Sequence, residues 1–345
     1  SIAGGAAVKA AADFESAVIE IEKVSNKETA SKLEGQIRSM AETVPLAQEQ
    51  LAGLAADAAR FGIEGSKNIQ RFTRTAADMS AATDLAAGNA GKALAKIAEQ
   101  VDVPTTQINN LGSSIVSLGN NFATSESEIV DAMQRGGKAA RQFGLDAQAI
   151  AGVSAQMNVM SESAEKAGTR VRRLAQEMTN PDKVKQFAKV LGLSAEEFRA
   201  MRNENPEKAL FKLVSAMEEG GQKGRELRKI FGTEVRNAIT SLAADTDGLR
   251  EALNLSKTAF EENSSLSSEA KRAYQSFNNQ LQIAFNKLRN VGITIGNLLL
   301  PPLLDLIDKV KAALAAFQSL TPSTQKFITK LGLAAAALGP VVFLI

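Results

Sequence analysis

The last quarter of the chain carries apolar side chains at strict 3,4 spacing, which is the pattern of a heptad seam. The seam residues are Tyr274, Phe277, Leu281, Ala284, Leu288, Val291, Ile295 and Leu298. A helix with such a stripe cannot cover it alone, so the pattern predicts a partner helix from this chain or from another copy of it. The stripe runs into Pro301-Pro302, resumes at Leu303 and precedes an almost wholly apolar C-terminus. We expect a long helix followed by an apolar hairpin.

The remainder of the sequence also favours helix. Val and Ile are scattered among Ala, Leu, Glu, Lys and Gln, and strict apolar-polar alternation is rare. All eight prolines fall where a helix would start, stop or kink. With 345 residues, 44% of them hydrophobic, the chain has material for a sizeable core. These features predict an all-α fold.

The spacing of the breaks predicts four regions. Residues 1–44 read as an extended amphipathic helical arm, and residues 45–253 read as a compact domain of short helices, each of roughly 10 to 18 residues. A Ser-rich stretch predicts a linker over 254–267. The final region, 268–345, is expected to be a long helix or helical hairpin that enters an apolar and potentially membrane-active segment.

Both ends of the sequence read as interior to a longer protein, because the chain begins without Met and stops within an apolar run. The uncharged runs 290–304 and 331–345 are shorter than the ~20 residues that span a bilayer as helix. We expect the first to be a core or interface helix. For the second, a buried helix and a membrane segment remain equally open.

The absence of Cys and His removes thiolate and imidazole metal ligands, the Ser-His-Asp and Cys-His arrangements, and the usual acid or base near neutral pH. Trp is also absent, and 40 basic residues against 38 acidic ones leave a charge of +2. Direct sequence-specific binding of nucleic acid is therefore not expected. We predict no catalytic residue, no cofactor and no metal site.

Two clusters could suggest a ligand site, but each has a simpler interpretation. Glu126, Glu128 and Asp131 gather where a helix is expected to start, and acidic residues there complement the helix dipole. Ser125 with Glu128 also has the spacing of a capping box. Residues 135–138, Arg-Gly-Gly-Lys, lack the spacing of a phosphate-binding loop and predict an interruption between helices.

Three other patterns predict local structure. Lys166, Arg170, Arg172 and Arg173 form a basic helix face that we expect to be solvated. Ser194 with Glu197, and Asn205 before Pro206, predict two more helix starts. Asn tolerates a positive φ, so Gly119, Asn120 and Asn121 predict a left-handed turn.

Two strings resemble the conserved amino-terminal region of phage tail tape measure proteins, the type shared by lactococcal phages and many prophages. They are residues 69–84 (IQRFTRTAADMSAATD) and the more specific 111–126 (LGSSIVSLGNNFATSE), which contains the Gly119-Asn120-Asn121 turn. The segments 299–303, 320–325 and 338–340 are similar to the way members of this family leave their globular region. The resemblance extends from Phe14 to the end of the chain.

This resemblance implies a structural protein of a long tail that lies in the lumen of the tail tube, sets tail length and leaves ahead of the DNA to help cross the cell envelope. It also implies host cytoplasm as the place of assembly. The implied partners are the tail tube protein, tail assembly chaperones, the baseplate hub, further copies of the chain and the host membrane. A compact domain cannot act as a straight ruler, so residues 45–253 are expected to sit at an end of the tube or outside it, or to unfold on threading.

Three other functions compete with this one. Composition alone would suit a helical interaction or scaffold module with no role in a tail, but the two strings argue against it. A tail-attached lytic enzyme would need a peptidase or transglycosylase region, and nothing in this sequence resembles one. A pore-forming toxin would share apolar helices but not the strings.

Overall fold

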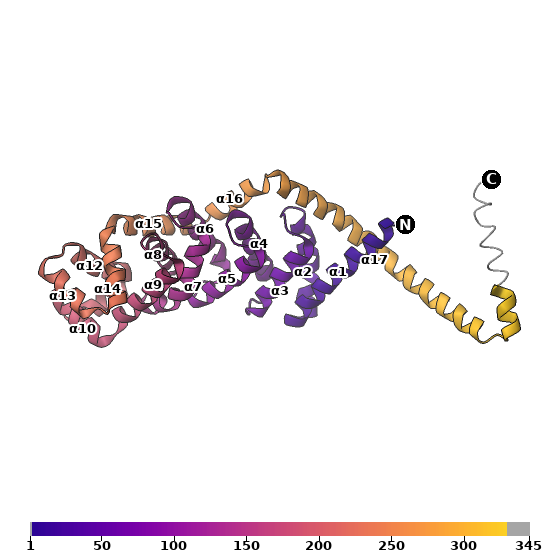
Figure 1. Cartoon of the computed structure of the whole chain (residues 1–345), viewed down its shortest axis with the longest axis horizontal. Helices are drawn as coiled ribbons and strands as arrows, with labels where there is room; N and C mark the ends of the chain where they lie inside the picture. Colours follow the sequence, from indigo (N-terminus) through magenta and orange to yellow (C-terminus); the bar gives the residue numbers. More distant parts are fainter. Residues whose placement is uncertain (1, 330–345) are drawn as a thin grey trace. The chain divides into compact units, whose positions relative to one another are not determined.

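The computed structural model of the chain describes residues 2–329, and Figure 1 shows its helices. They are α1 (Ile2–Val24), α2 (Lys27–Ala41), α3 (Gln48–Arg60), α4 (Ser66–Ala82), α5 (Ala87–Gln100), the 3-10 helix η1 (Thr105–Gln107), α6 (Ile108–Asn121), α7 (Glu126–Phe143), α8 (Ala147–Val159), α9 (Ala164–Thr179), α10 (Pro181–Val190), α11 (Ala195–Glu204), α12 (Pro206–Glu218), α13 (Gly221–Ile230), α14 (Thr233–Ala244), α15 (Thr246–Glu262), α16 (Ser265–Tyr274) and α17 (Phe277–Gln318). No strand occurs within 2–329, so the all-α class is confirmed. The predicted apolar segment 331–345 lies outside the described residues.

The chain divides into two compact units at places that differ from the predicted boundaries. The large unit is Phe14–Leu288, and the small unit combines Ser1–Asp13 with Arg289–Ile345. In the large unit α2 packs against α3 and α4, with Leu33 and Ile37 buried. The second half of the predicted N-terminal arm is therefore part of the same unit as the short helices that follow it.

The predicted linker over 254–267 is wrong for most of its length. Residues up to Glu262 belong to α15, which buries Leu249, Ala252 and Leu253. Asn263 ends this helix with a left-handed φ of 51°, and α16 begins at Ser265. The Ser-rich stretch thus starts the next helix directly, because two residues suffice for the turn.

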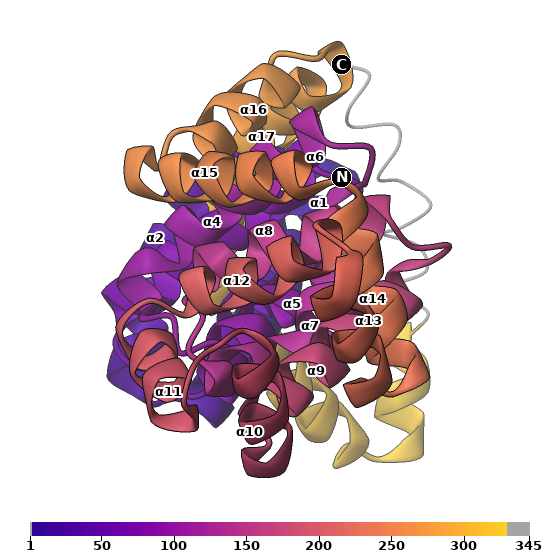
Figure 2. The same cartoon turned by 90° about the vertical axis from the view of Figure 1, so that its left-hand side faces the viewer.

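Short amphipathic helices build the core of the large unit. Figure 2 looks onto the end formed by α10 to α14, where Phe187 and Phe198 meet edge to face with ring centres 4.8 Å apart. The predicted capping boxes at Ser125 and Ser194 are present, and Asn205 accepts a hydrogen bond from the Lys208 amide at the start of α12. These side chains satisfy amide groups that have no partner within the helix.

The predicted interruption at residues 135–138 is wrong, because α7 runs unbroken from Glu126 to Phe143. Its glycines allow a close crossing with α9 instead. A Cβ on Gly136 would lie 2.7 Å from Val171 Cγ1, and a Cβ on Gly168 would lie 2.9 Å from the Ala132 carbonyl oxygen. These glycines let two helix backbones approach, which is a packing role.

The predicted left-handed turn at Gly119, Asn120 and Asn121 is also wrong. The three residues form the last turn of α6, and none of them has a positive φ. The Asn121 side chain donates to the Ser117 carbonyl at 2.8 Å, so it satisfies a helix-terminal acceptor. A Cβ on Gly119 would lie 2.5 Å from Glu126 Oε1, so Gly119 makes room for the start of α7.

In the small unit α1 and α17 meet through small residues. A Cβ on Gly296 would lie 2.5 Å from the Ala7 carbonyl oxygen and 2.8 Å from Ala11 Cβ. Ile293 on the same face of α17 is fully buried. Pro301 and Pro302 lie inside α17, so they neither start nor end this helix.

Candidate functional site

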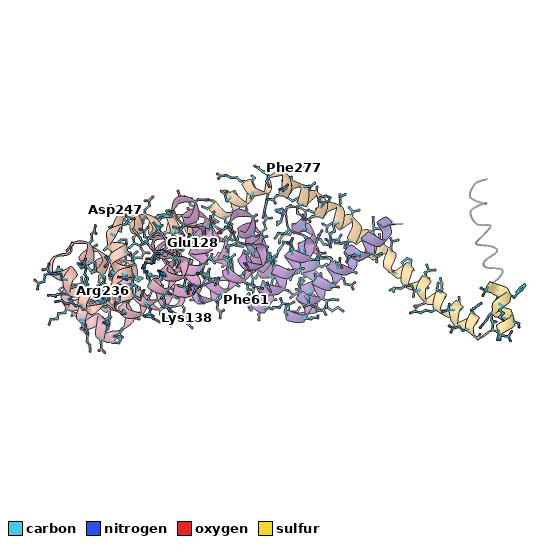
Figure 3. The ribbon with its side chains drawn as sticks, in the orientation of Figure 1. Phe61, Glu128, Lys138, Arg236, Asp247 and Phe277 are labelled. Atoms are coloured by element: carbon cyan, nitrogen blue, oxygen red, sulfur yellow. The ribbon has the colours of Figure 1, made fainter. Side chains whose placement is uncertain are left out.

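The predicted seam does not lie on one helix. Tyr274 is the last residue of α16 and is buried, whereas Phe277 begins α17 after Gln275 and Ser276. Phe277, labelled in Figure 3, is 80% exposed. The remaining seam residues are exposed along α17, namely Leu281, Ala284, Leu288, Val291, Ile295 and Leu298.

Within this chain α17 is buried through a face that does not carry the seam, so of the two expected partners a helix of the same chain is not the one that covers it. In the large unit Ile283 and Asn286 point inward, and Asn286 Nδ2 donates to the carbonyls of Ala41 at 2.9 Å and Leu46 at 2.8 Å. It also reaches the Val44 carbonyl at 3.2 Å. These acceptors lie at and just after the end of α2, where carbonyls have no partner within the helix. The face of α17 that packs within the chain is therefore a mixed one that combines Asn286 with Ile283 and Ile293.

The exposed apolar face continues beyond the prolines through Leu304, Leu306, Ile307, Val310 and Leu314. We call the exposed seam residues from Phe277 to Leu298 the α17 stripe. By length and composition α17 could cross a membrane, and 19% of its most apolar stretch of 18 residues is buried. The run 290–304, expected to be a core or interface helix, is thus not a core helix, since Leu298 and Leu304 are exposed.

A buried polar group joins α16 to α4. The Tyr274 hydroxyl donates to Asp78 Oδ1 at 2.5 Å, and Arg74 Nε donates to the same oxygen at 2.8 Å. Burial raises the pKa of Asp78, while Arg74 and the Tyr274 hydroxyl lower it to a smaller extent. Burial and then Asp78 raise the pKa of Tyr274, so the hydroxyl remains a donor. This group fixes the start of the C-terminal helices.

The acidic residues at the start of α7 have separate structural partners. Glu128 accepts from the Ser125 amide at 2.9 Å, and Asp131 pairs with Arg135 at 2.9 Å. Partial burial, together with Asp84 and Glu269, raises the pKa of Glu126. No group of acidic residues among those described could hold a metal ion.

The predicted basic face on α9 is divided. Arg170 donates to Ser161 Oγ at 2.8 Å and to the Met160 carbonyl at 3.3 Å, so it closes the end of α8. Lys166 pairs with Glu162 at 2.9 Å. Arg172 and Arg173 are exposed, as expected.

A cleft between α2 and α4 was not foreseen from the sequence. It has a volume of about 570 Å³ and is lined by Gln36, Ser39, Met40, Thr43, Lys67, Gln70, Arg71 and Arg74. The signal was the spacing of Lys67, Arg71 and Arg74, which places three cations on one side of a helix. We call this the α2–α4 cleft. The α2–α4 cleft and the α17 stripe are therefore both candidate binding surfaces.

Comparisons with known proteins agree with the resemblance that the two strings carry. A family model described as phage-related minor tail protein matches residues 34–232. A relative named "Probable tape measure protein", from Halomonas phage phiHAP-1, is 25% identical over 284 residues. The match covers 80% of this chain and 33% of the relative, so the chain spans about a third of that protein's length. No solved structure matches the chain. Because the family model covers more than half of the sequence, the chain belongs to the phage-related minor tail proteins.

Proposed function

We propose that the chain is part of a tape measure protein that sets the length of a phage tail and leaves the tail ahead of the DNA. The observation that carries the proposal is the match to a relative named as a tape measure protein, combined with a long helix whose apolar face is uncovered. The proposed place is the lumen of the tail tube. The proposed partners are the tube protein, the assembly chaperones, the baseplate hub and, on ejection, the host envelope.

Only part of the chain has the geometry of a ruler. α17 has 42 residues and is about 63 Å long at ~1.5 Å per residue. The large unit, Phe14–Leu288, would exceed about 400 Å as a single helix but is folded into a compact unit, and compact domains of this length have a radius of gyration of about 19 Å. We propose that helices of the α17 kind set the length, and that the large unit occupies an end of the tube.

Tail length measured by electron microscopy tests this proposal. The variant duplicates Phe277–Gln318 in the uncut gene of the tail-forming particle, and its 42 residues make six complete heptads, so the spacing of the stripe is preserved. We expect tails about 63 Å longer. The control inserts a flexible Gly/Ser segment of equal length at the exposed turn around Gly62, where tail length should not change. Unchanged tails in the first variant, or equal lengthening in both, would refute the proposal.

We also propose that the α17 stripe is covered by the same stripe of another copy. Its 3,4 spacing is that of a coiled coil, and Leu288 is 68% exposed. The substitutions Leu281→Glu and Leu288→Glu should disperse the oligomer in sedimentation experiments without loss of helical signal. Phe61 lies outside the stripe and is 43% exposed, so Phe61→Glu is the matched control. A wild-type chain that stays monomeric at every concentration would contradict the proposal.

A further inference from the structure

The α2–α4 cleft concentrates positive charge without a structural use for it. Lys67 and Arg71 lie one helical turn apart on α4, are exposed, and form no ion pair with any residue in the described part of the chain. Like charges at this spacing destabilise a helix. Arg74 adds a third cation, held in place by Asp78. The lining contains no carboxylate that faces these cations.

The wall opposite the cations suits a polypeptide. α2, which packs against α4, contributes Ser39 as a hydrogen-bonding group and Met40 as an apolar surface, and Thr43 lies just after the end of α2. Gln36 also lines the cleft. An acidic peptide supplies carboxylates for the cations and backbone amide groups for the polar side chains of this wall.

Nucleic acid fits the cleft less well. Binding to a phosphate backbone needs an extended basic surface, and the chain as a whole carries a charge of only +2. The cleft also offers no aromatic ring for stacking against a base. Its volume of about 570 Å³ lies in the range of a site for a few residues.

We propose that the α2–α4 cleft binds an acidic polypeptide segment, with Lys67 and Arg71 pairing with its carboxylates. Arg74 positions these contacts through its bond to Asp78. Nothing in this inference depends on tail length or ejection, so it stands apart from the proposed function.

Fluorescence anisotropy of a labelled octaglutamate peptide with the 345-residue chain tests the proposal. Lys67→Glu with Arg71→Glu should weaken binding by about tenfold, and the neutral pair Lys67→Ala with Arg71→Ala by less. The matched control is Lys92→Glu with Lys96→Glu. These lysines are also exposed and one turn apart, but their cleft contains Asp131. Control binding should stay within about twofold of the wild type.

Each other outcome overturns the proposal. Equal weakening in both double variants would mean that the peptide senses only net charge. If an octathymidylate binds the wild type as tightly as the peptide and loses affinity with Lys67→Glu and Arg71→Glu, the cleft recognises nucleic acid. Full displacement of the peptide by inorganic phosphate at low millimolar concentration would indicate a site for small anions. No peptide binding at low salt would refute it outright.

Discussion

Removing the hydroxyl of Tyr274 should destabilise the large unit in a pH-dependent way. This hydroxyl donates to the buried Asp78 at 2.5 Å, and hydrogen bonds to charged groups contribute about 1.5–3 kcal/mol. Tyr274→Phe keeps the ring and its packing but leaves the carboxylate with fewer donors. We expect a loss of about 2 kcal/mol at neutral pH, or a fall in Tm of roughly 3–4 °C for a unit of this length.

The pH dependence follows from proton linkage. Burial raises the pKa of Asp78 in the folded state above that of an unfolded aspartate. The folded state therefore holds the Asp78 proton more tightly, and this contributes fully to the free energy of unfolding below about pH 3.9. The contribution is lost as the pH rises through the folded pKa. The Tyr274 hydroxyl lowers this pKa, and its removal therefore raises the pKa further. The stability difference between wild type and Tyr274→Phe should grow with pH, from a small value near about pH 3.5 to its full size near about pH 7.5.

Urea unfolding followed by circular dichroism at both pH values measures this difference. The matched comparison is the same substitution in an Asp78→Asn background, where the acceptor is neutral and the effect should fall to about 1 kcal/mol or less. An equal loss of stability at both pH values would mean that Tyr274 acts through packing alone. If Tyr274→Phe left the free energy of unfolding unchanged at neutral pH, the hydrogen bond from Tyr274 to Asp78 would make no contribution to stability.

Three further substitutions test other contacts in the same unfolding experiment. Gly168→Ala should lower the free energy of unfolding by about 1–3 kcal/mol, because its Cβ would meet the α7 backbone. Gly35→Ala, in open space on α2, should raise it by about 0.5–1 kcal/mol. A change in the same direction for both variants would contradict the close crossing of α7 and α9. Asn286→Ala should cost about 1–3 kcal/mol, because buried carbonyls after α2 lose their donor, and an unchanged midpoint would show that water replaces it. Ser125→Ala should cost about 1 kcal/mol through loss of the α7 cap, and no effect would mean that Glu128 suffices.

Local features of this fold could be predicted because their causes lie within a few residues. The boxes at Ser125 and Ser194 need only a hydroxyl and a carboxylate three residues apart. Gly62, Gly144 and Gly192 follow helices with a positive φ, which glycine adopts without strain. In each case residues next to the helix end decide how the helix starts or stops.

Other features depended on residues far apart in the sequence. Gly136 looked like a break because its partner, Gly168, lies on another helix, and a glycine that lets backbones approach has the same local appearance as one that ends a helix. Nothing local marks Asn286 as buried, because the carbonyls that it satisfies lie some 240 residues earlier. The α2–α4 cleft was missed because periodicity places cations on a face without showing what faces them.

The contact at Asn286 also decides which face of α17 is left for a partner. Each residue of an α-helix turns ~100°, so with Asn286 facing inward, Leu288 and Ala284 lie about 200° away and Leu281 about 140° away. A polar anchor on one side therefore holds the α17 stripe outward. Fully burying a large apolar side chain contributes about 1.5–3 kcal/mol, which the chain does not gain from the stripe by itself. A patch of this extent normally marks an interaction site. A few hydrogen bonds thus keep this apolar helix face exposed, as the proposed pairing with another copy requires.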